Sequence, residues 1–407
     1  MVDGKFSNSA SQSAEVEVVL DRTPFYAEGG GQLPDGGRIT LKNGAVIEID
    51  DVQAPVPGLY VHRGQVIKGG VEVGEKVLAE IDRERRLAIS RAHTATHMVH
   101  KAFRETLGET ATQAGSENSP GRFRFDFPSA GAVPASVLSE VEERVNELLI
   151  DNLKVTAQIM SQPEAKAMGA MALFGEKYGD KVRVVSVGDW AHELCGGTHV
   201  SSSGELGLVK LISESSIGAG VRRVEALVGN DAYSFLAKEH LILNSITELI
   251  KGAKIEEIPE RISDLLDKVK TIEKEIQEFK TSQALDEAKE LLLKKVSFGK
   301  FEAIVAEFNK GIAGDTLRTI ALDLRSKISD GVVVLASKGE ERASVVAAVG
   351  TAGRNAGVKA GDLIKKASEI LGGGGGGKDD FAQGGGSNQD KLPEVFKAIN
   401  TLLGSLK

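Results

Sequence analysis

The spacing of apolar residues changes abruptly at Asp82, and this change requires a fold that mixes strands and helices in separate parts. Before it, residues 14–81 alternate apolar and polar positions and contain frequent Gly and Pro, a pattern typical of short strands joined by turns. Asn43-Gly44, inside "RITLKNGAVIEID", is a strong hairpin signal. We expect a small β-barrel-like domain over residues 1–81.

A long helix is predicted from Asp82 onward. The run "DRERRLAISRAHTATHMVHKAFRETLG" contains no proline and no glycine before Gly108; Asp82 suits the start of the helix and Gly108 its end. Further predicted strands are "GRFRFDF", "VRVVSVG", "GLVKLISESS" and "GVRRVEALVG", and "ASVLSEVEERVNELLIDNL" is a predicted amphipathic helix. Residues 82–237 are therefore expected to form an α+β domain.

The remaining residues divide into a helical segment and a small α/β domain. Residues 238–295 are rich in Glu and Lys, and apolar residues recur there at alternate spacings of four and three: Ile258, Ile262, Leu265, Val269, Ile272, Ile276 and Phe279. This heptad pattern favours a coiled coil. It is short, so a helical hairpin within the chain and a homodimer through 258–279 and the C-terminal domain are both open. Residues 296–407 are expected to form a C-terminal α/β domain, which contains the runs Gly372 to Gly377 and Gly384 to Gly386.

Composition is that of an ordinary soluble protein of several domains. The chain has 407 residues, 41% of them hydrophobic and 27% charged. No apolar run is long enough for a membrane span, and the N-terminus has no signal-peptide pattern. The single cysteine suits a reducing compartment, so a cytoplasmic location is expected. The net charge of −8 argues against broad, non-specific nucleic-acid binding but leaves local basic patches possible.

Two short segments concentrate the residues that bind metals. Five of the seven histidines and the only cysteine lie in "HTATHMVH" and "HELCGGTHV". On a helix, His93 and His97 lie one turn apart on one face, and Cys195 precedes His199 by the same spacing. We predict one shared site with the ligands His93, His97, Cys195 and His199. A mixed imidazole and thiolate set favours Zn²⁺.

Other interpretations of these residues remain open. Two histidines at this spacing are commonly just half-buried polar residues, and a single cysteine is commonly a small core residue. Cys195 is alternatively a nucleophile with His199 as its base, although the histidines of the helix would then have no role. His100 is the expected non-ligand, either beside the site or on the surface, and the role of His192 stays open.

The two segments resemble the zinc signature of the editing domain of alanyl-tRNA synthetases, which the free-standing AlaX trans-editing proteins share. "DRTPFYAEGGGQLPDGG" resembles the glycine-rich segment of the barrel that precedes that domain, and "ISESSIGAGVRRVEALVG" resembles the closing strand of the domain. "LGGGGGGKDDFAQGGG" is similar to the C-terminal domain shared with DHH phosphoesterases, the DHHA1-type domain. The resemblance covers essentially the whole chain. It implies the C-terminal half of such a synthetase, with an incomplete β domain, or a long AlaX-type protein.

The resemblance implies an aminoacyl-tRNA deacylase that hydrolyses tRNA(Ala) mischarged with Ser or Gly. No segment resembles the motifs that bind ATP and alanine, so no ATP-dependent ligase activity is expected from this chain alone. Thr96 and Gln113 are the implied editing residues. The resemblance favours Arg222 as a contact to the tRNA. Gly29, Gly30, Gly31 and Gln32 form a glycine-rich loop whose backbone amides are expected either to face a phosphate or the substrate or to form only a turn of the barrel. The C-terminal domain is implied to bind tRNA. The alternative is a tRNA-binding module without catalysis, in which zinc is structural.

Overall fold

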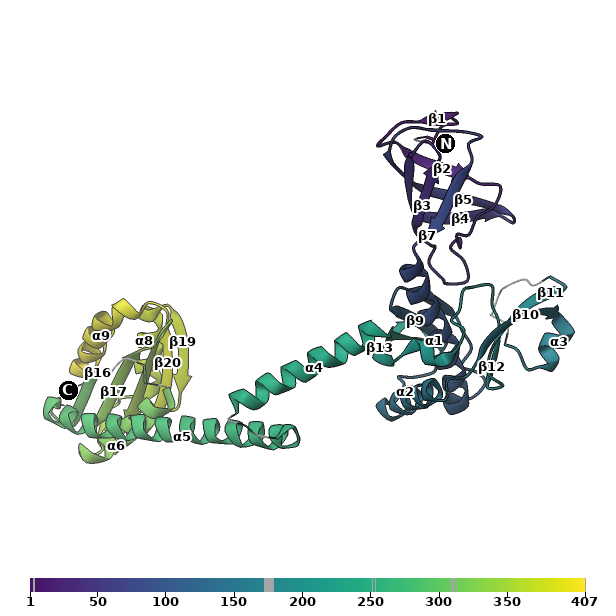
Figure 1. Ribbon diagram of the computed structural model, residues 1–407. Helices are drawn as coiled ribbons and strands as arrows, with labels where there is room; N and C mark the ends of the chain where they lie inside the picture. The colour runs from purple at the N-terminus through teal and green to yellow at the C-terminus, as the bar shows by residue number, and fades with distance from the viewer. Residues whose placement is uncertain are drawn as a thin grey trace. The chain divides into compact units, whose positions relative to one another are not determined.

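The computed structural model describes residues 1–2, 4–171, 179–250, 252, 254–308, 311–312 and 314–406. The chain forms a mixed α+β structure of two compact units, Met1–Leu249 and Ile250–Lys407 (Figure 1). The finer division into four parts stays a prediction. Among the described residues, no helix is both long and apolar enough to cross a membrane.

The first unit begins with an antiparallel sheet in the strand order β2-β5-β4-β3-β7. Its strands are β2 (Glu15–Val19), β5 (Leu59–Lys68), β4 (Val46–Val56), β3 (Gly37–Leu41) and β7 (Val77–Ile81), and a separate pair joins β1 (Ser9–Ala10) to β6 (Val71–Glu72). The Asn43-Gly44 turn is confirmed, since Asn43 Oδ1 accepts a hydrogen bond from the Ala45 amide at 2.9 Å. Closure of this sheet into a barrel stays a prediction.

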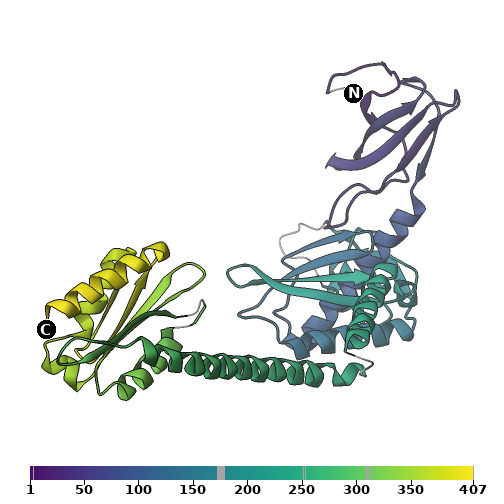
Figure 2. The same cartoon turned by 90° about the vertical axis from the view of Figure 1, so that its left-hand side faces the viewer.

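Helix α1 (Arg83–Leu107) follows this sheet directly (Figure 2). The predicted ends are confirmed: Asp82 caps the helix by accepting a hydrogen bond from the Arg85 amide, and Gly108 follows its last turn. The helix lies against an antiparallel sheet in the order β13-β14-β9-β8. In β9, alternation buries Phe123, Phe125 and Phe127 in the core.

The rest of the first unit surrounds this core. A three-stranded antiparallel sheet has the order β10-β11-β12, and α2 packs against α1. The elements are β8 (Gly115–Ser119), β9 (Arg122–Pro128), α2 (Ala135–Ile150), β10 (Val155–Ser161), α3 (Gln162–Ala167), β11 (Lys181–Val187), β12 (Ala191–Leu194), β13 (Val209–Gly218), β14 (Val221–Val228) and α4 (Asn230–Leu249).

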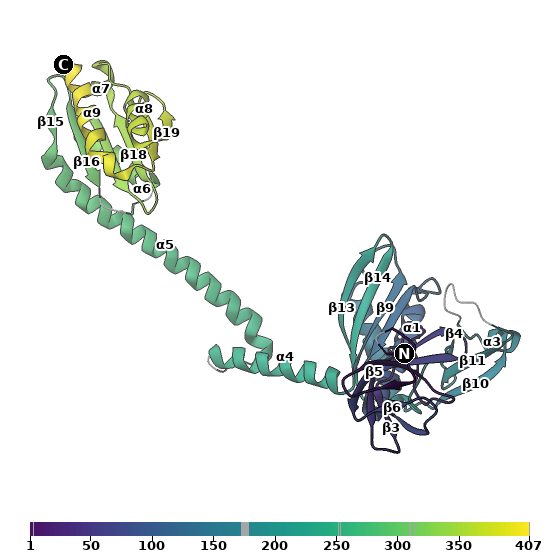
Figure 3. The same ribbon diagram turned by 90° about the horizontal axis from the view of Figure 1, so that it is seen from above.

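The second unit is built on a six-stranded sheet in the order β15-β16-β17-β18-β20-β19, in which only β16 and β17 run parallel. Helix α6 and the end of α5 cover one face, and α8 and α9 cover the other (Figure 3). The bounds are α5 (Ile258–Leu291), β15 (Val296–Ser297), β16 (Glu302–Phe308), α6 (Gly314–Lys327), β17 (Val332–Lys338), β18 (Ala343–Val349), α7 (Thr351–Asn355), α8 (Ala360–Leu371), β19 (Gly373–Gly377), β20 (Phe381–Gly386) and α9 (Leu392–Ser405).

Helix α5 displays most of the predicted heptad positions to solvent. Ile258 is buried, but Leu265, Val269 and Ile272 are about half exposed, at 49%, 52% and 53%. Burial resumes only near the end of the helix, where Ala284, Ala288 and Leu291 join the core of the second unit. The core of this unit therefore leaves the apolar stripe uncovered, and the choice between a hairpin and a dimer stays open.

The glycine runs form a hairpin. Gly373–Gly377 is strand β19, which pairs with β20 in antiparallel register at the edge of the sheet. The sequence left open whether this segment was a disordered linker or an ordered surface lined by backbone. The structure gives an ordered strand, in which glycine permits close contact with β20.

Candidate metal centre and its surroundings

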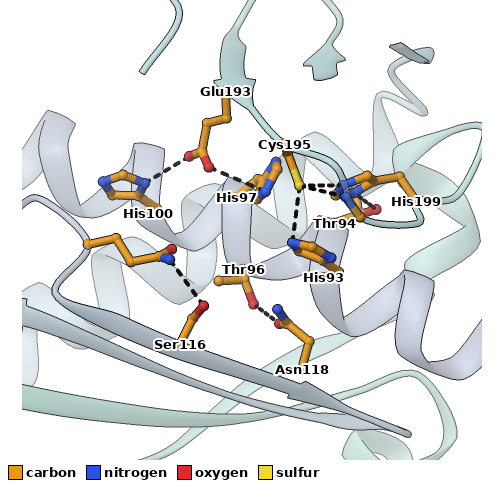
Figure 4. Close-up of polar contacts among 12 residues, drawn as sticks. His93, Thr94, Thr96, His97, His100, Ser116, Asn118, Glu193, Cys195 and His199 are labelled. Atoms are coloured by element: carbon orange, nitrogen blue, oxygen red, sulfur yellow. Dashed lines mark hydrogen bonds and ion pairs between the residues drawn. The ribbon is translucent and has the colours of Figure 1, made fainter. Parts of the chain in front are cut away.

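The four predicted ligands come together in the first unit. His93 and His97 lie on the buried side of α1, and Cys195 and His199 lie in the segment after β12. One ligand atom from each residue falls within 4.8 Å of the others (Figure 4). The structure thus brings two segments that are distant in sequence into a cluster that could hold a metal ion.

The distances within the cluster fit a tetrahedral ion. Cys195 Sγ lies 3.4 Å from His93 Nε2 and 3.3 Å from His199 Nε2. At usual zinc bond lengths, the nitrogen and sulfur ligands of a tetrahedral site are separated by about 3.6 Å. Three imidazoles and one thiolate are also ligand types that zinc prefers. The ligand types and the two sulfur–nitrogen distances therefore fit such an ion.

Neighbouring side chains orient two of the imidazoles. His93 Nδ1 lies 2.8 Å from Gln32 Oε1, and His199 Nδ1 lies 3.0 Å from Thr94 Oγ1. Each contact leaves the Nε2 atom directed toward Cys195. Such partners fix the tautomer and the ring orientation of histidines that bind metals.

The third imidazole has a different environment. His97 Nε2 lies 3.3 Å from Glu193 Oε2, and the other carboxylate oxygen of Glu193 lies 2.8 Å from His100 Nδ1. His97 Nδ1 is buried, and no hydrogen-bond partner for it is found among the described residues. A buried nitrogen without a protein partner in a residue of this cluster fits a role as a metal ligand.

Burial keeps the clustered histidines neutral. It lowers the pKa of His93 well below its usual value, and His97 and Arg183 lower this pKa further. The pKa of His199 is also lowered well below its usual value, by burial first and then by His93, His97 and Arg183. Neutral imidazole is the form that binds metals.

Two glycines allow the close approach of the surrounding loops. A Cβ atom at Gly197 would lie 2.2 Å from His93 Cε1 and 2.7 Å from Gln32 Oε1. Gly31 has a φ of +77°, and a Cβ atom there would lie 2.3 Å from Ser116 Oγ. Both positions therefore require glycine, one for space alone and the other for space and for its left-handed backbone.

Gln32 joins the N-terminal sheet region to the loop of Cys195 and His199. Its side chain is fully buried; its Oε1 accepts a hydrogen bond from the Thr198 amide at 2.8 Å, and its Nε2 donates to Thr198 Oγ1 at 2.9 Å. Arg183 holds the same loop from β11 by donating to the carbonyls of Cys195 and Gly197 at 2.7 and 2.9 Å. The loop is thus fixed from both sides.

The implied editing residues occupy different places. Thr96 is buried on α1 between the two histidine ligands, and its hydroxyl contacts Asn118 Oδ1 at 2.6 Å. Gln113 is half-buried before β8 and donates to Ser116 Oγ at 3.1 Å. Thr96 therefore lies on the same helix as the two histidine ligands. Gln113 instead contacts Ser116 on strand β8.

The implied tRNA contacts are mostly engaged within the protein. Gly29 and Gln32 close a tight turn around Gly30 and Gly31 through two backbone hydrogen bonds. Arg222 forms an ion pair with Glu214, and Arg223 forms one with Asp126 at 2.7 Å. The carboxylates raise the pKa of both guanidinium groups, so these arginines stay charged and paired.

Other polar residues lie around the four-residue cluster. His100 faces Glu193 and lies outside the cluster, as expected, and so does His192, whose role the sequence left ambiguous and whose Nδ1 lies 2.8 Å from Ser186 Oγ. Sequence reasoning missed Thr94, Glu193, Arg183 and Asn118. Thr94 and Glu193 lie inside the two predicted ligand segments, and their polar side chains close to the ligands in sequence are the signal that could have found them.

Family models match three stretches of the chain. The DHHA1 domain matches residues 300–405, the "Threonyl and Alanyl tRNA synthetase second additional domain" matches residues 182–225, and "tRNA synthetases class II (A)" matches residues 1–85. The second match contains Glu193, Cys195 and His199. This family match therefore includes two of the four residues of the candidate metal centre, whereas His93 and His97 precede it.

Relatives match nearly the whole chain. The alanine-tRNA ligase of Acidothermus cellulolyticus is 56% identical over 400 residues, which are 98% of this chain and 45% of the relative. That of Nocardioides sp. is 54% identical over 404 residues, with the same shares. The crystal structure of the C-Ala domain from Aquifex aeolicus alanyl-tRNA synthetase is 32% identical, with 27% of this chain and 97% of that chain covered and a TM-score of 0.25, which is too low to support an argument about fold.

The chain spans about half the length of the curated relatives that it matches, 45% of each of the two named above. The matched part includes the second additional domain and the DHHA1 domain. The chain therefore belongs to the alanine-tRNA ligase family and corresponds to the carboxyl-terminal portion of its members, which contains the editing domain.

Proposed function

We propose that this chain removes wrongly attached serine or glycine from tRNA(Ala) by hydrolysing the ester. The observation that carries the proposal is the cluster of His93, His97, Cys195 and His199. Two of its members, Cys195 and His199, lie in the part matched by the synthetase second additional domain. Water adds to the ester carbonyl carbon, the bond to the ribose oxygen of the tRNA breaks, and the free amino acid and the tRNA with its hydroxyl leave. No ligase activity is proposed for the chain alone.

The proposed cofactor is Zn²⁺, held by the four clustered residues. Bound zinc would polarise the carbonyl group of the ester or activate a water molecule. Four protein ligands also suit a structural ion, so the protein residues around the cluster must do part of the work. We assign Thr96 and Gln113 to contact with the aminoacyl group, and Gln32 to holding His93 and the loop at Thr198.

A second site for hydrolysis has a clear physical benefit. Serine exceeds alanine by one hydroxyl group, and a pocket built for alanine excludes it only weakly. A site that instead binds the hydroxyl discriminates strongly between seryl and alanyl esters. An alanyl group would leave the polar groups of that site without hydrogen-bond partners. This logic supports a polar site near Thr96, whose hydroxyl is buried.

The other parts of the chain are proposed to bind and position tRNA. We propose a β-barrel-like domain at 1–81, the zinc editing domain at 82–237, a helical segment at 238–295 and a DHHA1-type tRNA-binding domain at 296–407. Gly29, Gly30, Gly31 and Arg222 are proposed to face the end of the tRNA. In the last domain, the exposed side chain of Lys366 supports a role in phosphate contact, as does the sequence position of Lys365 and Lys378 beside the glycine hairpin.

Deacylation of purified Ser-tRNA(Ala) tests the function. Cys195→Ala and His97→Ala should each lower the rate by more than about 100-fold, since losing a ligand should exceed the 10- to 100-fold effect of losing an outer partner. His192→Ala is the matched control, because His192 contacts Ser186 outside the cluster, and it should retain the rate. Full activity of both ligand variants would refute the proposal.

The alternative function is a tRNA-binding module in which zinc is only structural, an arrangement that four protein ligands favour. It predicts that the unmodified chain binds tRNA(Ala) but leaves Ser-tRNA(Ala) intact. Measuring binding and hydrolysis on the same preparation separates the two functions.

A further inference from the structure

Asn118 contains a buried amide group with an unused hydrogen-bonding atom. The residue lies on β8 and is fully buried. Its Oδ1 accepts a hydrogen bond from Thr96 Oγ1 at 2.6 Å. Its Nδ2 is also buried, and no acceptor reaches it among the residues that the structure describes. Native proteins rarely leave such a group unpaired unless it serves a function.

The backbone fixes Asn118 in this place. Its amide donates to the Gly31 carbonyl at 2.7 Å, and its carbonyl accepts from the Leu33 amide at 3.1 Å. On its other side, β8 pairs with β9 and sets Asn118 opposite Phe123. The side chain is therefore held beside Thr96 and cannot reach a new partner by a small shift of the strand.

The chemistry of the Thr96 and Asn118 pair suits a hydroxyl group. Thr96 Oγ1 lies near two acceptors, Asn118 Oδ1 and the Ala92 carbonyl at 3.0 Å, but it has one hydrogen. If Thr96 donates that hydrogen to Asn118 Oδ1, the Nδ2–H group of Asn118 and a lone pair of Thr96 Oγ1 stay without hydrogen-bond partners. If it goes to Ala92, the amide turns, donates to Thr96 and leaves its own carbonyl unused. A hydroxyl both donates and accepts, so it satisfies either arrangement.

We propose that Asn118 is a specificity-determining residue, which together with Thr96 binds the side-chain hydroxyl of the amino acid to be removed. The inference rests on the hydrolytic function proposed above. Figure 4 shows the Asn118 amide next to Thr96, on the side of α1 from which His93 also projects. An alanyl group presents only a methyl group to this pair and leaves the Asn118 amide without a partner. Binding of correctly charged Ala-tRNA(Ala) is therefore disfavoured.

Substrate comparison tests this role. Asn118→Ala removes the amide, and Asn118→Ser retains a group that can donate and accept. Deacylation rates are measured on Ser-tRNA(Ala) and on Gly-tRNA(Ala), whose amino acid has no hydroxyl. Ser119→Ala is the control, because Ser119 is adjacent on β8 and its hydroxyl meets only the exposed Arg122 carbonyl.

Asn118→Ala should lower the ratio of the seryl rate to the glycyl rate about 10- to 100-fold, the range for one buried hydrogen bond to a substrate. Asn118→Ser should restore part of the ratio, and Ser119→Ala should leave it unchanged. An unchanged ratio in Asn118→Ala, whether both rates fall together or neither falls, would overturn the role of Asn118. If the unmodified chain hydrolyses neither ester, the proposed function fails instead, and the two failures are thereby distinguished.

Discussion

At the scale of single residues, the candidate site depends on a few contacts that cross between distant segments. The clustering of the four candidate ligands could be predicted, because His and Cys are scarce and fall into two short segments. The residues that orient them could not. Gln32 and His93 are 61 positions apart, and Gln32 and Thr198 are 166 apart. Nothing in the local pattern of the sequence indicates that such residues meet.

Gly197 is the residue whose replacement tests this packing most simply. Gly197→Ala would push a methyl group against His93 and Gln32, and overpacking of this kind costs about 1–3 kcal/mol. We expect a lower free energy of unfolding and less zinc per chain, measured by denaturation and metal analysis. Gly196→Ala is the matched control, since a Cβ atom there meets nothing within 4 Å. Equal behaviour of the two variants would contradict the packing described.

His62 links stability to pH in the N-terminal sheet. It is fully buried, with Nε2 2.7 Å from Thr23 Oγ1, and burial lowers its pKa from the usual 6.5 although the Val18 carbonyl raises it. As the pH falls, His62 therefore takes up a proton near pH 6.5 in the unfolded chain but only at a lower pH in the folded chain. The free energy of unfolding thus decreases as the pH drops below 6.5. His62→Gln should show a smaller loss of unfolding free energy between pH 8 and about pH 5.5. The same pH dependence in both proteins would argue against this.

At the scale of elements, the periodicity of apolar residues predicted helices and strands well in segments that keep one regular spacing. The ends of α1 at Asp82 and Gly108 and the alternation of β9 are confirmed. The glycine runs could not be assigned, because glycine lacks the side-chain pattern on which periodicity depends. Their strand conformation follows from contacts with β20 and α8, which are visible only in the fold.

The glycine hairpin offers a test with its own control. A Cβ atom at Gly375 would lie 2.5 Å from Gly384 Cα and 2.8 Å from Ile364 Cγ2, whereas one at Gly374 meets nothing within 4 Å. Gly375→Ala should destabilise the second unit by about 1–3 kcal/mol. Gly374→Ala should be neutral or stabilising by up to about 1 kcal/mol, because alanine loses less entropy. Calorimetry of both variants measures the difference, and equal melting profiles would contradict the register of β19 and β20.

At the scale of the whole molecule, the sequence predicted the family, but not how the parts associate. The apolar stripe of α5 illustrates the gap. A heptad pattern indicates that a helix seeks a partner, but it does not say whether the partner lies in the same chain. The partner stays undetermined because the core of the second unit leaves the stripe exposed.

Association through the stripe gives a direct expectation. If two copies pair along residues 258–279, the double substitution Val269→Glu and Ile272→Glu places charges in the seam and should convert a dimer to a monomer in analytical ultracentrifugation. Glu273→Gln, at a charged position next to the seam, is the control and should keep the dimer. A dimer that survives the double substitution would show that another surface joins the copies.

Zinc-dependent hydrolysis is the central claim, and one measurement tests it most directly. The rate of Ser-tRNA(Ala) deacylation is followed before chelation, after chelation and after addition of Zn²⁺, while circular dichroism monitors the fold. We predict a loss of more than about 100-fold with the fold retained, and recovery with Zn²⁺. A metal-free chain that hydrolyses Ser-tRNA(Ala) at the full rate would contradict the account.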